Sequence, residues 1–131
     1  MSTGKGIVVH DRQTEKTVVI VEDDEDIGWV LVQCIVQETP FRALLVTNGS
    51  DALQAMRTTH PSLLLLDYRL PGMNGIELYD RLQDVEGGKD IPVVMISANL
   101  PHREIAQRHL VGMHKPVDLY ELLQTIETLI A

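Results

Sequence analysis

Acidic side chains stand at the ends of two apolar segments of this chain. The four leucines of 63–66 run directly into Asp67, and the β-branched segment 17–21 runs into Glu22 and Asp23. An uninterrupted apolar run of this length is typical of a strand that is buried on both faces of a parallel sheet. The carboxyl ends of such strands meet at one edge, where open α/β sheets bind their ligands. We therefore expect three carboxylates to converge there.

Two further apolar segments bring a hydroxyl and an amine to the same edge. Segment 91–96 ends at Ser97, and segment 111–114 is followed by Lys115. Crowded carboxylates repel one another unless a cation lies among them, and ligands that are all oxygen atoms suit Mg²⁺. As a nucleophile, Asp67 would form an acyl phosphate. The Lys115 ammonium would neutralise charge on the transferred group, and the Ser97 hydroxyl would donate to one of its oxygens.

Strands and helices are expected to alternate along the chain, and this alternation predicts the architecture that positions the polar residues. Apolar residues recur at helical spacing after most strands, but segment 101–110 carries only a thin apolar stripe and predicts a short or frayed helix. The expected fold is α/β, with a doubly wound parallel sheet of five strands and helices on both faces. The expected strands span 17–21, 41–46, 63–66, 91–96 and 111–114. The expected helices start at Asp26, Gly49, Gly75, Pro101 and Leu119, with Asp26 as the N-cap of the first.

Length and composition favour one soluble domain without a nucleic-acid surface. The chain has 131 residues and a formal net charge of −8, whereas phosphate backbones are bound by basic patches. The single cysteine, Cys34, excludes an internal disulfide and favours a reducing cytoplasm. No apolar run approaches the roughly 20 residues that span a bilayer. We expect residues 1–16 to form an N-terminal tail and 17–131 to form the domain, with a cytoplasmic location and no membrane partner.

Four segments together resemble the response-regulator receiver domain of two-component signalling, in the CheY-like superfamily. They are Val-Val-Ile-Val-Glu-Asp-Asp at 18–24, Leu-Leu-Leu-Leu-Asp-Tyr-Arg-Leu-Pro-Gly-Met-Asn-Gly at 63–75, Ile-Pro-Val-Val-Met-Ile-Ser-Ala at 91–98, and Lys115-Pro116. The resemblance covers 17–131. It implies a flavodoxin-like fold with strand order 2-1-3-4-5, which is the order the family shares with flavodoxin.

The resemblance also implies a function and a ligand set. A sensor histidine kinase or a histidine phosphotransfer protein would phosphorylate Asp67, and the phosphorylated state would switch the interaction with an output partner. Mg²⁺ would be held by Glu22, Asp23, the Asp67 carboxylate and the backbone carbonyl of Arg69. Such a chain is a signalling module, not an enzyme with a separate substrate, although it catalyses its own phosphoryl transfer and the hydrolysis of its acyl phosphate.

Two features of the segment between Ser97 and Lys115 depart from the family pattern. The segment is shorter than usual by about one helical turn, which predicts a shortened or irregular fourth helix. The family carries an aromatic residue three positions before the lysine, and here that position is Gly112. The usual aromatic switch therefore cannot operate there. The two departures leave open an alternative function, a phosphorylation-independent receiver that acts as an interaction module. A magnesium-dependent phosphatase is disfavoured, because no second acid lies two residues after Asp67.

The first helix carries more apolar residues than one buried face needs. The residues expected to face the sheet are Ile27, Val30, Leu31 and Cys34. A rotation of about 100° per residue then directs Trp29, Val32 and Val36 toward water. Either the apolar segment 7–9 covers that face, or it is a docking site for a kinase or phosphotransfer helix or for a second copy of the chain. The sequence leaves these alternatives open.

Overall fold

A computed structural model describes residues 16–130 of the chain. The predicted tail 1–16 therefore lies almost wholly outside the described residues, as does the apolar segment 7–9 that was considered as a cover for the first helix. The boundary of the domain at residue 17 stays a prediction.

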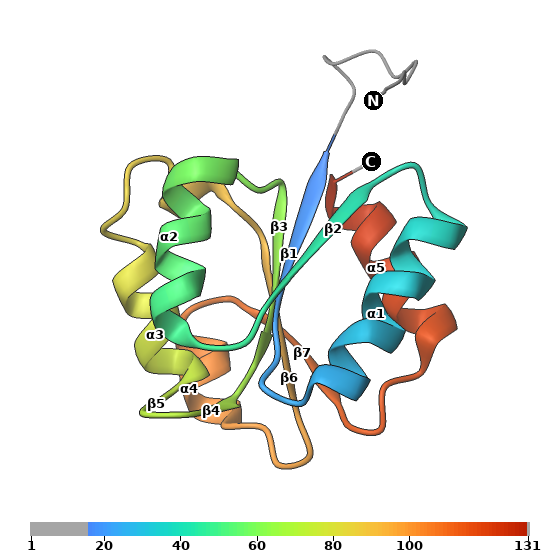
Figure 1. Ribbon diagram of the computed structural model, residues 1–131. Helices are drawn as coiled ribbons and strands as arrows, with labels where there is room; N and C mark the ends of the chain where they lie inside the picture. The colour runs from blue at the N-terminus through green and yellow to red at the C-terminus, as the bar shows by residue number, and fades with distance from the viewer. Residues whose placement is uncertain (1–15, 131) are drawn as a thin grey trace.

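A parallel sheet of five strands forms the centre of the molecule, with the strand order β2-β1-β3-β6-β7 (Figure 1). This is the predicted order 2-1-3-4-5. The sheet strands are β1 Thr17–Val21, β2 Arg42–Val46, β3 Leu63–Asp67, β6 Val93–Ser97 and β7 Val111–His114. A small antiparallel pair, β4 Arg69–Leu70 and β5 Met73–Asn74, follows β3.

Helices cover both faces of the sheet, as predicted for a doubly wound fold. Figure 1 shows α1 and α5 on one face and α2, α3 and α4 on the other. The helices are α1 Glu25–Glu38, α2 Gly49–Thr59, α3 Gly75–Leu82, α4 His102–Gln107 and α5 Leu119–Ile130, with a 3₁₀ turn at Gly88–Asp90. Within residues 16–130, no helix has the length and apolar character needed to cross a membrane.

The leucine run of β3 fills the core on both sides of the sheet. Leu63 and Leu65 pack under α1 and α5, and Leu64 and Leu66 pack under α2 and α3. Successive side chains of a strand point to opposite faces, so a central strand covered on both faces needs an apolar residue at every position. The carboxylate of Asp67 ends this run at the point where the strand emerges from between the helices.

The predicted orientation of helix α1 is wrong by part of a turn. Its N-cap is Asp24, which accepts hydrogen bonds from two backbone amides of the first turn, and not Asp26. The residues of α1 that are buried are Gly28, Leu31, Val32 and Ile35. Ile27 and Val30 are 40% and 54% exposed instead of facing the sheet. Val32, predicted to face water, is buried, whereas Trp29 and Val36 are exposed as expected.

Gly28 explains that error. A Cβ at this position would lie 2.6 Å from a methyl carbon of Leu45 on β2, so the helix backbone approaches the sheet closely at this point. Residues 28, 31, 32 and 35 follow the same helical spacing as the predicted set. The glycine contributes no apolar side chain to the pattern, so the apolar spacing predicted that the neighbouring face of α1 would be buried.

Helix α4 is a short helix of six residues, as predicted. Its buried residue Ile105 and the preceding Leu100 pack over Gly112 of β7. A Cβ on Gly112 would lie 3.2 Å from a methyl carbon of each of these two side chains. Leu100 and Ile105 thus fill the space beside the position where the family carries its aromatic residue.

A bidentate ion pair connects Arg108, the residue after α4, to Asp80 of α3. The guanidinium of Arg108 donates to both carboxylate oxygens of Asp80, at 2.8 and 2.9 Å, and to the Glu104 carboxylate at 3.1 Å. The hydrogen bond from Arg108 is the main reason that the pKa of Asp80 lies below its ordinary value. Asp80 therefore contributes stability above the ordinary aspartate pKa of 3.8, and this contribution is lost as the pH falls through the lower folded-state pKa.

Replacing Asp80 with asparagine is expected to lower the melting temperature slightly at pH 7, because the pair is exposed and screened by solvent. Parent and variant should converge in acid, where the Asp80 carboxylate of the parent is protonated. Thermal melts at pH 7 and at a series of acidic pH values below the ordinary aspartate pKa of 3.8 measure this. Asp84→Asn, at an exposed aspartate four residues further on, is the control for the change in net charge. An equal difference at every pH value would contradict the assignment to the ion pair.

Candidate functional site

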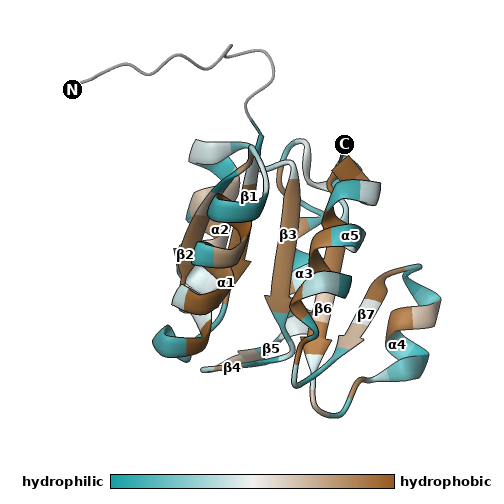
Figure 2. Ribbon diagram, turned by 90° about the vertical axis from the view of Figure 1, so that its right-hand side faces the viewer, coloured by the Kyte–Doolittle hydropathy of each residue, from teal (hydrophilic) through white to brown (hydrophobic). Residues whose placement is uncertain are grey.

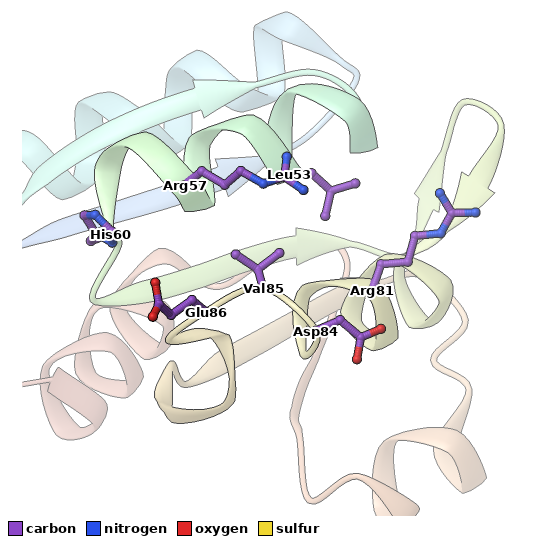
Figure 3. Close-up of a pocket in the computed structure, with 7 residues that line it drawn as sticks. All are labelled: Leu53, Arg57, His60, Arg81, Asp84, Val85 and Glu86. Atoms are coloured by element: carbon purple, nitrogen blue, oxygen red, sulfur yellow. The ribbon is translucent and has the colours of Figure 1, made fainter.

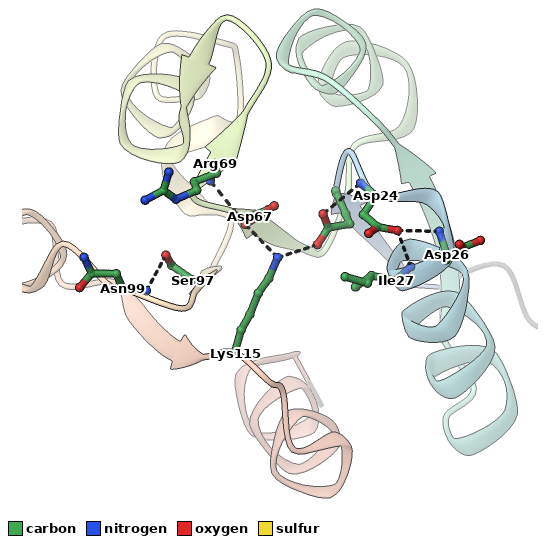
Figure 4. A network of polar contacts seen from close by, with 9 residues as sticks. Asp24, Asp26, Ile27, Asp67, Arg69, Ser97, Asn99 and Lys115 are labelled. Carbon is green, nitrogen blue, oxygen red and sulfur yellow. Dashed lines mark hydrogen bonds and ion pairs between the residues drawn. The ribbon is translucent and has the colours of Figure 1, made fainter.

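A buried ion-pair cluster lies at the carboxyl edge of the sheet (Figure 4). Asp67 and Glu22 are only 6% and 3% exposed. The Lys115 ammonium lies 3.2 Å from Oε1 of Glu22 and 3.3 Å from Oδ1 of Asp67. One cation therefore bridges two buried carboxylates, although Lys115 lies 93 residues from Glu22 in the sequence. Glu22 follows β1, Asp67 ends β3, and Lys115 follows β7.

The strand ends position these three side chains. Asp67 is the last residue of β3, in the middle of the sheet between β1 and β6. The backbone amide of Glu22 donates to Val46 on β2, which continues the parallel ladder one residue beyond β1. The backbone amide of Lys115 donates to Ser97 in the same way at the end of β7. Backbone pairing thus brings the polar residues to one edge, as the sequence predicted.

Three carboxylates of this edge form a group that can share a metal ion. Glu22, Asp23 and Asp67 each offer an oxygen atom, and these atoms lie within 4.8 Å of one another. Oxygen ligands of Mg²⁺ sit at about 2.0–2.1 Å from the ion, so small rotations of the side chains would let all three reach one ion. Asp23 is exposed, which leaves one side of the group open to water ligands. The donor set therefore fits a hard divalent cation.

The fourth predicted ligand, Arg69, lies beside this group. Its backbone amide donates to Oδ1 of Asp67 at 3.4 Å, which is a long hydrogen bond. This contact places residue 69 at the cluster, and the role of its carbonyl oxygen as a ligand stays a prediction.

The cluster carries more negative charge than Lys115 can neutralise. Burial raises the pKa of Glu22 to about 7, and the nearby Asp67 carboxylate also raises it. The hydrogen bond from the Asp24 amide and the charge of Lys115 lower this pKa, but they do not outweigh burial. Burial also acts to lower the pKa of Lys115, but the attraction of Asp67 and Glu22 outweighs this, and its pKa lies above the ordinary value. The ammonium is thus held charged, whereas burial favours the protonated form of Glu22.

Ser97 lies at the same edge but not in the ion-pair cluster. It is buried, and its Oγ accepts a hydrogen bond from the backbone amide of Asn99 at 3.1 Å. Among residues 16–130, no hydrogen bond joins Ser97 to Asp67 or Lys115 through their side chains. In Figure 4 the Ser97 side chain lies on the other side of Lys115 from Asp24 and the start of α1.

Sequence reasoning missed one contributor to the cluster. The backbone amide of Asp24 donates to Oε2 of Glu22 at 3.2 Å, while the Asp24 carboxylate caps α1. Asp24 therefore links the start of the helix to the site. The signal was present, since Asp24 follows Glu22 and Asp23 directly, but the acidic run did not reveal which member would be the cap.

A hollow of about 540 Å³ lies elsewhere, between α2 and the segment that follows α3 (Figure 3). Its lining residues are Leu53, Arg57, His60, Arg81, Asp84, Val85 and Glu86. None of the predicted site residues lines it. The hollow is therefore not part of the candidate site.

Comparisons with known proteins agree with this geometry. Residues 18–127 match the family model described as "Response regulator receiver domain". The polar-differentiation response regulator DivK of Brucella ovis is 28% identical over 117 residues, which cover 86% of this chain and 94% of DivK. The transcriptional regulatory protein BaeR of Escherichia coli is 32% identical over 90 residues, which cover 69% of this chain and 35% of BaeR.

The fold is also shared with solved structures. A CheY-like response regulator receiver domain from Methylobacillus flagellatus superposes with a TM-score of 0.80 at 24% identity, covering 88% of this chain and 99% of that one. Vibrio cholerae CheY4 superposes with the same TM-score of 0.80 at 20% identity. With the family match over most of its length and the acidic cluster at the predicted edge, the chain belongs to the response regulator receiver domain family.

Proposed function

We propose that this chain is a phosphoacceptor receiver module in which Asp67 accepts a phosphoryl group in a Mg²⁺-dependent reaction. The observation that carries the proposal is the Lys115 ammonium, which lies 3.2 and 3.3 Å from the buried Glu22 and Asp67 carboxylates beside the three-carboxylate group. An exposed lysine would gain little from such a contact. A lysine held between buried acids next to an open acidic group supports a role in neutralising a transferred anion.

The metal site is assigned to the residues at that edge. Glu22, Asp23, the Asp67 carboxylate and the carbonyl of Arg69 would hold Mg²⁺. When bound, the ion would neutralise charge on the phosphoryl oxygens during transfer. The three carboxylate oxygens within 4.8 Å of one another support this assignment.

The transfer itself is a displacement at phosphorus. A carboxylate oxygen of Asp67 attacks the phosphorus of a phosphohistidine on the donor protein, the phosphorus–nitrogen bond breaks, and the leaving imidazole takes up a proton. Lys115 pairs with an oxygen of the phosphoryl group on Asp67. Ser97 Oγ already accepts from the Asn99 amide, so its own hydrogen is free to donate to a second phosphoryl oxygen.

The partners follow from this chemistry. The donor would be a sensor histidine kinase or a histidine phosphotransfer protein, and the phosphorylated chain would change its affinity for an output partner by shifting between two conformations. The module would also catalyse hydrolysis of its own acyl phosphate. We assign it to the cytoplasm, and its charge of −8 argues against a nucleic-acid partner. A second copy of the chain is a further candidate partner.

A second candidate function is supported by the surroundings of Gly112. Leu100 and Ile105 pack against this glycine, and residues 99–114 contain no Tyr, Phe or Trp. A receiver without the usual aromatic switch could bind its partner in one state only, independently of phosphorylation. The two functions differ in one observable, since only the first requires Asp67 to become phosphorylated.

Addition of Mg²⁺ is expected to raise the melting temperature of the protein, because the ion relieves repulsion that exists only in the folded cluster. At a Mg²⁺ concentration 100 times the dissociation constant, the stabilisation is about 2.7 kcal/mol. Thermal melts in Mg²⁺ and in a chelator measure it. Asp23→Asn should remove most of the effect, while Asp26→Asn, in the same acidic run but outside the group of three, should retain it. Equal responses in the two variants would contradict the assignment of the site.

A further inference from the structure

The hollow between α2 and the segment after α3 has no part in the candidate phosphoacceptor site (Figure 3). His60, one of its lining residues, is the C-cap of α2 and lies shortly before β3, which begins at Leu63. Asp67 is the last residue of β3, and Figure 2 shows this hydrophobic strand ending beside β4 and β5. The hollow therefore lies toward the opposite end of β3 from the candidate site.

The middle of the hollow is apolar and packs against the core. Leu53 of α2 and Val85, which follows α3, are partly buried and contact the core cluster under these helices. In Figure 3 they lie between Arg81 at one end and His60 and Glu86 at the other. The hollow thus has two polar ends of different chemistry, separated by an apolar surface on which a flat ring can pack.

Two arginines form one end of the hollow. Arg57 of α2 and Arg81 of α3 are both exposed, and in Figure 3 the Arg57 side chain is directed toward Leu53. Within residues 16–130, neither guanidinium takes part in an ion pair or a side-chain hydrogen bond. Asp84 also lines the hollow, but its side chain points away from Leu53 in Figure 3. Two positive charges therefore outnumber one negative charge at this end, and guanidinium groups bind phosphate through paired hydrogen bonds.

A carboxylate and an imidazole form the other end. Glu86 and His60 are exposed, and in the described part of the chain the Glu86 carboxylate forms no ion pair and accepts no hydrogen bond. A carboxylate accepts hydrogen bonds from the amino group of a nucleobase, such as N4 of cytosine. It cannot form this bond with a carbonyl oxygen at the same position, because both atoms are acceptors. This end therefore favours a base that carries an exocyclic amino group.

We propose that this hollow binds a nucleoside monophosphate whose base carries an exocyclic amino group. Arg57 and Arg81 bind the phosphate. Leu53 and Val85 pack against the base and the ribose, and Glu86 accepts a hydrogen bond from the amino group. The volume of about 540 Å³ lies within the range of about 300–1,000 Å³ that is typical of small-molecule pockets.

The proposed ligand is compatible with the acidic character of the chain. A nucleic-acid backbone is bound by a basic patch, which the net charge of −8 disfavours, whereas a single phosphate needs only the two arginines at one end of the hollow. The inference goes beyond phosphoryl transfer at the candidate site and does not depend on it.

Titration calorimetry with cytidine monophosphate and uridine monophosphate tests the proposal. The two probes differ at position 4 of the base, where cytosine has an amino group and uracil has an oxygen atom. Both are added in a chelator, so that no Mg²⁺ draws the phosphate to the acidic group at the carboxyl edge of the sheet. The parent is expected to bind cytidine monophosphate at least tenfold more tightly than uridine monophosphate, which is the discrimination given by one good base contact. Inorganic phosphate, which contacts only the arginines, should also bind more weakly than cytidine monophosphate.

Three variants and a control assign the contacts. Arg57→Gln and Arg81→Gln should each bind cytidine monophosphate at least tenfold more weakly, because each loses charge-assisted hydrogen bonds to the phosphate. Glu86→Gln should lose the preference between the two probes, because an amide can accept from an amino group or donate to a carbonyl oxygen. Arg103→Gln, at an exposed arginine of α4, is the control and should bind like the parent. All four side chains are exposed, so the fold should be retained, and circular dichroism checks this.

A parent that does not bind cytidine monophosphate at up to about 10 mM, which covers weak affinities, would overturn the proposal. Equal affinities for cytidine monophosphate and inorganic phosphate would also overturn it and would identify the hollow as an adventitious anion site only. Equal affinities for the two nucleotides would contradict the role of Glu86, and binding that both arginine variants leave unchanged would place the nucleotide elsewhere. Phosphorylation of Asp67 by a small acyl phosphate is measured separately, so failure of the hollow to bind a nucleotide leaves the proposed function intact, and the reverse.

Discussion

Replacing Asp67 with asparagine is expected to abolish phosphoryl acceptance by this protein. An amide has almost the same shape as the carboxylate but lacks the anionic oxygen that attacks phosphorus. The substitution also removes one of the three carboxylates that would hold Mg²⁺, so it weakens binding of the ion as well. Both effects act on the same step, because Asp67 is the carboxylate at the tip of the buried strand β3.

Phosphate-affinity electrophoresis after incubation with Mg²⁺ and a small acyl phosphate measures this loss. The parent should show a shifted band and Asp67→Asn should show none. Asp84→Asn, which changes one exposed aspartate on another part of the surface, should be labelled like the parent. Labelling of Asp67→Asn at the rate of the parent would place the acceptor elsewhere.

Replacing Lys115 with methionine is expected to slow phosphorylation by roughly 10²–10³-fold, the range seen when one preorganised group that stabilises a developing anion is removed. The same substitution should tighten Mg²⁺ binding. The Lys115 ammonium lies 3.2 and 3.3 Å from oxygens of Glu22 and Asp67, so in the parent it repels a cation that approaches the same carboxylates. Opposite changes in metal affinity and in rate therefore distinguish a catalytic lysine from one that only stabilises the fold.

The two effects are measured on one variant by Mg²⁺ titration of the Trp29 fluorescence and by the rate of labelling with a small acyl phosphate. Trp29 is the single tryptophan of the chain. Lys89→Met, at an exposed lysine of the 3₁₀ turn, is the control. A variant that loses metal affinity and rate together has lost the structure of the site. One that keeps the rate of the parent shows that Lys115 has no role in the transfer.

The sheet and the position of the site could be predicted because they depend on patterns within short segments. Each central strand is an unbroken apolar run, and the residue after it is polar. Parallel pairing then brings Glu22, Asp67 and Lys115 to one edge without any knowledge of side-chain conformation. The short α4 could be predicted for a similar reason, since the segment from 101 to 110 has too few apolar residues for a long helix.

The orientation of α1 and the contacts of single side chains could not be predicted in this way. The buried face of α1 includes the close approach of Gly28 to Leu45. A glycine has no apolar side chain, so it does not contribute to the apolar pattern from which the buried face was predicted. The Arg108–Asp80 pair joins residues 28 positions apart, and nothing in either local segment indicates the other. Ser97 lies outside the ion-pair cluster, and its hydroxyl accepts a hydrogen bond from the Asn99 amide instead, which is a detail of the loop geometry.

The most direct test of the central claim is the intact mass of the parent protein after incubation with a small acyl phosphate, in Mg²⁺ and in a chelator. The account predicts a gain of one phosphoryl group in Mg²⁺, located by peptide mapping at Asp67, and no gain in the chelator. A folded protein that binds Mg²⁺ and yet gains no phosphoryl group at Asp67 would contradict the account and would favour the phosphorylation-independent receiver.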